Sequence, residues 1–182
     1  MAVALILCRG LQMAKAKGFT TEPKVDRREA SNYVGIRTQV PRSGMGKFVR
    51  SATKELFEWL GARGITSMGP PFLRYYVIDM EGSMDLEIGV PVNAPIEGDD
   101  RVKAGVLPAG EYASLVYTNA RRGYAGNKAL VEWARDKGLK WDRWDDPNGD
   151  AFASRYESFL TDPADEPDMG KWDTEVAIKL AE

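Results

Sequence analysis

The chain contains the same helical motif twice, and this internal repeat limits the folds that the chain can adopt. The first copy spans residues 54–65 (KELFEWLGARGI) and the second spans residues 128–139 (KALVEWARDKGL), with Lys, Leu, Glu, Trp and Gly at matching positions. Each copy has the spacing of an amphipathic helix. Each also ends at a glycine, Gly64 or Gly138, the residue that best tolerates the left-handed conformation at a helix C-terminus. We interpret the two copies as a duplicated module rather than as two unrelated surface helices.

Strand-like segments flank the two helices in the same order. Each helix is preceded by one run of β-forming residues and followed by two more, so each half reads β-α-β-β. One additional strand is expected before each unit. The predicted strands are Lys24–Arg28, Tyr33–Val40, Phe72–Met80 and Asp85–Val92 in the first half, and Arg101–Leu107, Glu111–Thr118, Ala153–Leu160 and Thr174–Leu180 in the second.

This pattern predicts an α+β fold in which duplicated β-α-β-β modules form a curved antiparallel sheet with helices on one face. Grooves between packed units often hold ligands, so a ligand cleft is expected at the pseudo-twofold junction of the modules. We divide the chain into an N-terminal extension, residues 1–21, and one domain, residues 22–182, whose halves span about 22–95 and about 101–182.

The N-terminal extension begins with a short apolar run, Ala2–Cys8, far below the roughly 20 residues that a transmembrane helix needs. No basic residues precede this run, as they would in a signal peptide, so we expect a cytoplasmic protein without membrane association. We interpret the extension as disordered or docked or, with Met13 as the true start, as a misassigned N-terminus.

Two residue counts exclude several kinds of chemistry. The chain has no histidine, so a His-based triad, an imidazole base and a histidine metal ligand are all excluded. Cys8 is the only cysteine, which excludes an intramolecular disulfide and a cysteine-cluster zinc site. Catalysis would therefore use Asp, Glu, Lys, Tyr, Ser or Thr. Because no coherent set of metal ligands is visible, we expect neither a metal nor a cofactor.

Charge is unevenly distributed along the chain, although the net charge is only −2. Residues 1–64 carry 12 basic and 5 acidic side chains, or +7, whereas residues 65–182 carry 13 and 22, or −9. The acidic part is typical of a solvated surface or of a cleft that attracts cations, and the basic part could contact an acidic partner. With a pI of about 5.4, the chain lacks the overall basic field of a nucleic-acid-binding protein.

Glu157 is the residue whose position points most strongly to a site. It lies in the middle of the predicted strand Ala153–Leu160, where glutamate is disfavoured unless it is exposed or partnered. Strand alternation places it on one face with Arg155 and Phe159, so a solvent-facing position or an ion pair near Arg155 would explain it structurally. In an aromatic pocket, desolvation would instead raise its pKa, and it could pair with a cation or transfer a proton. Glu87, in the middle of a first-half strand, raises the same question.

Aromatic side chains are interleaved with acidic ones in the last part of the chain. Each of them alone is typical of a core residue, because an aromatic ring buries a large area. As a group beside carboxylates, they also match an aromatic cage, in which ring faces attract cations. The residues are Trp141, Trp144, Phe152, Tyr156, Phe159 and Trp172.

Five short motifs follow one another with the order and spacing of a known family. They are Tyr33-Val34-Gly35-Ile36-Arg37 after Glu22-Pro23, Asp85–Val92 (DLEIGVPV), Leu107–Ala113 (LPAGEYA), Tyr156–Pro163 (YESFLTDP) and Trp172–Val176 (WDTEV). Together they make the span from Glu22 to Leu180 resemble the GyrI-like small-molecule-binding domain, which is also the effector-binding domain of AraC-type and MerR-type regulators.

The resemblance implies a duplicated β-α-β-β fold with a central ligand cleft. In related drug-sensing domains, a glutamate on the strand before an Asp-Pro pair binds hydrophobic cations among aromatic walls, and that position here is Glu157. The acidic segment Trp141–Asp150 departs from the family pattern. With Glu87 added from its strand position, the further candidates for ligand binding are Tyr112, Tyr117, Tyr124, Trp144, Trp172 and Glu87.

Three functions follow as hypotheses, and they leave open whether the protein is an enzyme. The first is a stand-alone protein that binds a flat hydrophobic molecule, neutral or cationic, through aromatic stacking and Glu157. The second resembles GyrI-like hydrolases that open the cyclopropane rings of DNA-alkylating natural products. In this metal-free hydrolase, Glu157 activates water and Tyr112 stabilises the developing oxyanion. The third is an interaction module with gyrase as its partner, because some GyrI-like proteins are linked to the protection of DNA gyrase.

Direct DNA binding is not expected, because the residues before Glu22 are too few for a helix-turn-helix.

Overall fold

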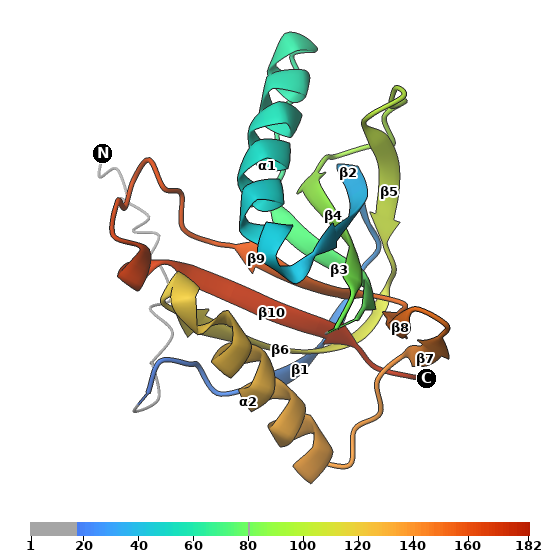
Figure 1. The fold of residues 1–182 in the computed structure, drawn as a ribbon, viewed down its shortest axis with the longest axis vertical. Helices are drawn as coiled ribbons and strands as arrows, with labels where there is room; N and C mark the ends of the chain where they lie inside the picture. Colours follow the sequence, from blue (N-terminus) through green and yellow to red (C-terminus); the bar gives the residue numbers. More distant parts are fainter. Residues whose placement is uncertain (1–17, 80) are drawn as a thin grey trace, which may run out of the picture.

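One antiparallel sheet of ten strands carries both helices in the computed structural model, which describes residues 18–79 and 81–182 (Figure 1). The predictions for Ala2–Cys8 and Met13 lie outside the described residues. Neither helix in the described ranges is long and apolar enough to cross a membrane. The helices are α1 (Met45–Ala62) and α2 (Gly123–Asp136), and the strands are β1 (Lys24–Arg28), β2 (Ser31–Pro41), β3 (Phe72–Ile78), β4 (Ser83–Pro91), β5 (Lys103–Leu107), β6 (Gly110–Thr118), β7 (Arg143–Asp146), β8 (Gly149–Phe152), β9 (Arg155–Phe159) and β10 (Asp173–Lys179).

The two helices repeat each other in detail, as the sequence predicted. An ion pair spans one turn of each helix, between Lys54 and Glu58 at 3.7 Å in α1 and between Lys128 and Glu132 at 3.8 Å in α2. The chain passes beyond each helix through a left-handed glycine, with φ values of 64° at residue 64 and 70° at residue 138. The duplication therefore extends from the sequence to the local structure.

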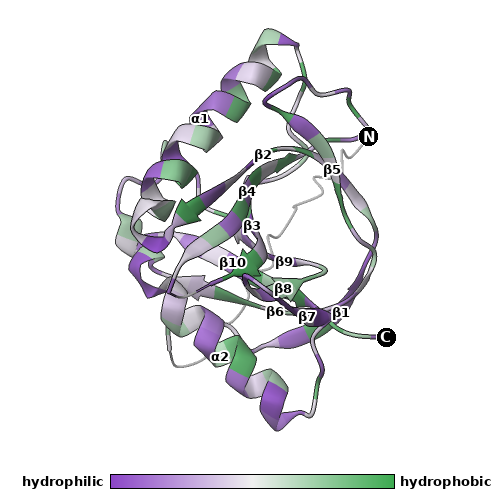
Figure 2. Ribbon diagram, turned by 45° about the vertical axis from the view of Figure 1, so that its right-hand side comes forward, coloured by the Kyte–Doolittle hydropathy of each residue, from purple (hydrophilic) through white to green (hydrophobic). Residues whose placement is uncertain are grey.

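Each helix packs its apolar stripe on the same face of the sheet, which we call the helix face. In the first half, Leu56 of α1 belongs to a core with Ile36 of β2 and Ile88 of β4, and all three side chains are completely buried. In the second half, Leu130 of α2 packs in a core with Leu115 of β6. The sheet curls away from the helices, and Figure 2 shows β1 and β5 on the far side. We call this inner side the concave face.

The two halves exchange their edge strands. β1 comes from the first half but pairs with β6, whereas β5 comes from the second half and pairs with β2. The strand order is therefore β1-β6-β10-β9-β3-β4-β2-β5. The additional strand predicted before each unit is present, but it completes the sheet of the other unit. The halves at about 22–95 and about 101–182 thus share one sheet.

An antiparallel pair, β3 and β9, joins the halves at the pseudo-twofold junction, with Leu73 opposite Glu157. These two residues occupy equivalent positions in their halves, because Ile88 of β4 lies opposite Leu73 as Val176 of β10 lies opposite Glu157. A buried leucine in the first half therefore corresponds to a buried glutamate in the second.

The hairpin formed by β7 and β8 was not predicted. It begins in the acidic segment Trp141–Asp150, whose charged residues have low β-propensity, and ends two residues beyond it at Phe152. β8 pairs with β3, so that Ala151 lies opposite Val77. The hairpin thus extends the sheet beside the β3–β9 junction.

Candidate functional site

Glu157 lies on the helix face where the two halves meet. Only 7% of the residue is exposed, so the solvent-facing position considered from the sequence is wrong. Its strand, β9, runs between α1 and α2 in Figure 1. A carboxyl group in this position loses most of its hydration, and it needs hydrogen-bond donors from the protein.

Three side chains from different elements interact with the Glu157 carboxylate. The Tyr75 hydroxyl of β3 donates a hydrogen bond of 3.2 Å to Oε2, and the Asn127 amide of α2 donates to Oε1. The Tyr117 hydroxyl of β6 interacts with the same group. Burial raises the pKa of Glu157, although these donors and the charge of Arg155 oppose the shift. Burial and the negative charge of Glu157 also raise the pKa of both tyrosines, so they remain donors at neutral pH.

A glycine brings α2 close enough to hold Tyr117 in this site. A Cβ atom at Gly126 would lie 2.4 Å from Cδ1 of the Tyr117 ring, a distance that requires something to move. In the first half, α1 carries Ala52 at the equivalent position, where the sheet has Thr38 instead of tyrosine. The glycine in α2 therefore makes room for an aromatic ring that the first half lacks.

Arg155 provides a positive charge beside the Glu157 carboxylate. Its Nη2 donates to Oδ1 of Asn127 at 2.8 Å, so Asn127 bridges the guanidinium and the carboxylate. The guanidinium lies 5.0 Å from the ring centroid of Phe152 and 5.7 Å from that of Tyr75, in cation–π contact with both. Burial lowers the pKa of Arg155 from its usual value. The ion pair near Arg155 that is expected from the sequence is therefore indirect, because Asn127 couples the two charged groups.

Only Tyr117 among the predicted aromatic residues meets Glu157. Tyr112 lies on the concave face, opposite to Glu157, and its hydroxyl donates to the carbonyl of Pro108 at 2.7 Å. Tyr124 is 71% exposed on α2 and Trp144 is 52% exposed on β7. Trp172 precedes β10 and donates its indole N–H to the Glu166 carbonyl at 2.7 Å. The structure does not bring these four residues to the Glu157 carboxylate.

Glu87, the other predicted carboxylate, is buried on the concave face. It accepts hydrogen bonds from the hydroxyls of Tyr33 at 2.6 Å and Tyr76 at 2.7 Å. Its equivalent in the second half is Glu175. Glu87 directly precedes Ile88 in β4, and Glu175 directly precedes Val176, the residue equivalent to Ile88, in β10. Glu87 and Glu157 therefore do not form one site.

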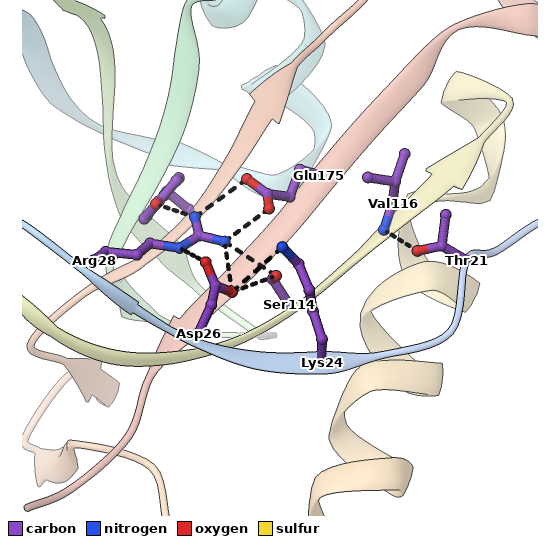
Figure 3. Close-up of polar contacts among 8 residues, drawn as sticks. Thr21, Lys24, Asp26, Arg28, Ser114, Val116 and Glu175 are labelled. Carbon is purple, nitrogen blue, oxygen red and sulfur yellow. Dashed lines mark hydrogen bonds and ion pairs between the residues drawn. The ribbon is translucent and has the colours of Figure 1, made fainter. Parts of the chain in front are cut away.

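The concave face has its own aromatic cluster, in which Phe72 and Tyr156 meet across the junction with ring centroids 5.6 Å apart. A pocket of about 180 Å³ opens beside these rings and is also lined by Arg28. Figure 3 shows that the Arg28 guanidinium is already held by Glu175, at 2.7 Å, and by Asp26. Because Asp26 and Glu175 already neutralise the charge of Arg28, we interpret this cluster as a structural network.

Three contributors to the Glu157 site, Tyr75, Arg155 and Asn127, are not predicted from the sequence. Tyr75 lies in the predicted strand Phe72–Met80, but the sequence does not show which face of the sheet its side chain occupies. The sequence indicates only that Arg155 is a neighbour of Glu157. Asn127 gave no signal, because a polar residue on an amphipathic helix is usually solvated. Within the described ranges, no group of three or more acidic or cysteine side chains is arranged to hold a metal ion.

Solved structures share this fold at low sequence identity. The C-terminal domain of EcmrR aligns with a TM-score of 0.68 and 18% identity, covering 88% of this chain and 98% of that domain. A hydrolase from Listeria innocua aligns with a TM-score of 0.61 and 14% identity over 88% of this chain and 92% of the other. SAV2435 bound to tetraphenylphosphonium aligns with a TM-score of 0.55 and 9% identity over 88% and 94%.

EcmrR has also been solved in a complex with DNA. The chain aligns there with a TM-score of 0.69 and 18% identity, and 90% of it is covered, but it spans only 58% of that EcmrR chain. Among curated proteins, none matches the sequence significantly. Residues 21–181 match the GyrI-like small molecule binding domain, which confirms the resemblance found in the motifs. The chain therefore belongs to the GyrI-like small-molecule-binding domain family.

Proposed function

We propose that the protein binds a flat hydrophobic molecule on the helix face between α1 and α2, with Glu157, Tyr75 and Tyr117 forming the base of the site. The observation that carries this proposal is the buried Glu157 carboxylate at the junction of the halves. The equivalent position in the first half is Leu73, so the carboxylate is not required by the fold. Keeping a carboxylate in such a position costs stability, which is typical of groups retained for binding or catalysis.

Ligand binding at this site requires a local rearrangement. Both carboxylate oxygens already accept hydrogen bonds, from Tyr75 and from Asn127. Asn127 is partly exposed on α2, so its side chain is the partner that a ligand can replace with the smallest movement. The rings of Tyr75 and Tyr117 then supply aromatic surface for stacking.

Calorimetric titration with a panel of aromatic compounds, both neutral and cationic, tests the proposal. Tetraphenylphosphonium belongs in the panel because SAV2435 binds it. We expect Glu157→Gln to weaken binding of the best compound at least about tenfold, because the carboxylate positions Tyr75 and, through Asn127, Arg155. Glu87→Gln is the matched control, since Glu87 is also buried and held by two tyrosines but lies on the concave face. Equal affinities of both variants and wild type would overturn the role of Glu157.

Hydrolysis is a second candidate function, favoured by a carboxyl of raised pKa beside two tyrosine hydroxyls. In this reaction water would add to a strained ring carbon, and the electrons of the broken ring bond would move to a conjugated carbonyl. Glu157 would take the proton from water, and Tyr75 or Tyr117, rather than Tyr112, would donate to the developing oxyanion.

Mass spectrometry of a cyclopropanoid alkylator after incubation with the protein separates the two functions. A hydrolase forms the ring-opened, water-added product over many turnovers, and Glu157→Gln abolishes this product. A binding protein leaves the compound unchanged but co-purifies with it.

A further inference from the structure

The Glu157 site contains its own counter-cation. Asn127 donates to the Glu157 carboxylate through its amide nitrogen and accepts from Arg155 through its amide oxygen. A single side chain thus couples one negative and one positive group. The rings of Tyr75 and Phe152 lie against the same guanidinium, so the arginine occupies the aromatic surroundings that a bound cation would occupy.

Arg155 also has hydrogen-bonding capacity that the protein does not use. Its Nε–H is buried and has no acceptor among the described residues, and the one hydrogen bond that its side chain makes to them runs from Nη2 to Asn127. A buried donor without an acceptor is unfavourable, and a ligand oxygen at this position would satisfy it.

A permanently charged cation would interact unfavourably with Arg155. It would compete with Arg155 for Glu157 and place a second positive charge beside the guanidinium, where few water molecules screen the repulsion. The charge of Asp150 on β8 also acts on Arg155, but Asp150 is exposed and already forms an ion pair with Arg143 at 2.6 Å, so it does little to offset a second positive charge. Glu87 and Glu175 both lie on the concave face and do not approach the site. The repulsion acts as a selection against cations.

We propose that Arg155 determines the charge preference of the site: it selects an uncharged aromatic molecule that carries a strong hydrogen-bond acceptor oxygen, and it disfavours permanent hydrophobic cations. This inference rests on the proposed function and narrows its ligand class. Arg155 supplies donors to the acceptor oxygen, while Tyr75 and Tyr117 contact the rings.

Two compounds that differ only at one group provide the probe. Triphenylphosphine oxide is neutral and has a strong acceptor oxygen, whereas methyltriphenylphosphonium has the same three rings and a permanent positive charge. We expect wild type to bind the oxide at least about tenfold more tightly than the phosphonium, since hydrogen bonds to charged groups have effects of this size.

Substitution of Arg155 should reverse this preference. Arg155→Met keeps the length of the side chain but removes its charge and donors, so oxide affinity should fall about tenfold and phosphonium affinity should rise. Arg155→Gln keeps a neutral donor, and it should retain part of the oxide affinity while also gaining the phosphonium. Arg37→Met is the matched control, because Arg37 stacks on Tyr76 at 3.6 Å but is exposed on the concave face.

The outcomes separate the inference from the function on which it rests. The inference is overturned if wild type binds both compounds equally, or if neither Arg155 variant gains affinity for the phosphonium while circular dichroism shows both to be folded. If neither these two compounds nor any member of the aromatic panel binds wild type, the proposed function itself fails, and the charge preference fails with it.

Discussion

Glu157 and Glu87 are both mid-strand glutamates held by tyrosine hydroxyls, yet their surroundings differ. Glu87 accepts two short hydrogen bonds, of 2.6 and 2.7 Å, whereas the one from Tyr75 to Glu157 is longer, at 3.2 Å. At Glu157 the cost of burial exceeds the stabilisation from its partners, so its pKa is raised. Folding therefore favours the protonated form of the Glu157 carboxyl group.

The raised pKa predicts a specific dependence of stability on pH. The folded protein binds the Glu157 proton more tightly than the unfolded chain, whose carboxyl has the ordinary value of 4.5. The contribution of Glu157 to the free energy of unfolding is thus full below about pH 4.5 and is lost as pH rises through the folded pKa. Denaturant unfolding between pH 4 and 8 should show Glu157→Gln gaining stability relative to wild type as pH increases. A difference that is constant with pH would contradict the assignment.

Asn127 holds two charged groups at once, so its removal should be costly. Asn127→Ala leaves both an oxygen of Glu157 and Nη2 of Arg155 without this partner. We expect a loss of about 1–3 kcal/mol in the free energy of unfolding, the usual cost of leaving buried polar groups unpaired. Asn148→Ala, in the exposed β7–β8 turn, should cost less than Asn127→Ala. Equal losses would show that the bridge contributes nothing measurable.

At the scale of elements, the two helices are copies that differ where they meet the sheet. Gly126→Ala in α2 would force a Cβ to within 2.4 Å of the Tyr117 ring, whereas Gly61 of α1 has nothing within 4 Å of the added atom. We expect Gly61→Ala to stabilise by up to about 1 kcal/mol through helix propensity. Gly126→Ala should instead destabilise by about 1–3 kcal/mol through overpacking. Thermal denaturation of both variants measures whether each substitution stabilises or destabilises the protein. A stabilised Gly126→Ala variant would contradict the close contact between Gly126 and the Tyr117 ring.

Local patterns predicted the elements well but not how they combine. The repeated helices, the strands around them and the glycine ends all follow from residue preferences over short segments. Residue preferences do not show whether two residues on different strands lie on the same face of the sheet, because this depends on the register of the strands. This is why Tyr112 and Glu157 were assigned to one site although they lie on opposite faces. The β7–β8 hairpin was missed because tertiary pairing with β3 overrides the weak β-propensity of its charged residues.

At the scale of the whole molecule, the exchange of edge strands makes the two halves interdependent. β1 completes the second half and β5 completes the first, while the β3–β9 ladder joins them in the middle. Neither half can unfold without removing a strand from the other. The Glu157 site depends on the same arrangement, because its partners come from β3 in one half and from β6 and α2 in the other.

This interdependence predicts one cooperative unfolding transition. Leu56 of α1 and Leu130 of α2 are fully buried at equivalent positions, so Leu56→Ala and Leu130→Ala should each cost about 2–5 kcal/mol. Because the halves share strands, each substitution should lower amide protection in β2 and β4 and in β6 and β10 by similar amounts. Hydrogen exchange in the two variants measures this directly. If Leu56→Ala loosened only the first-half strands, or if heating gave two transitions, the shared sheet would not couple the halves, and the site at their junction could open by separating them.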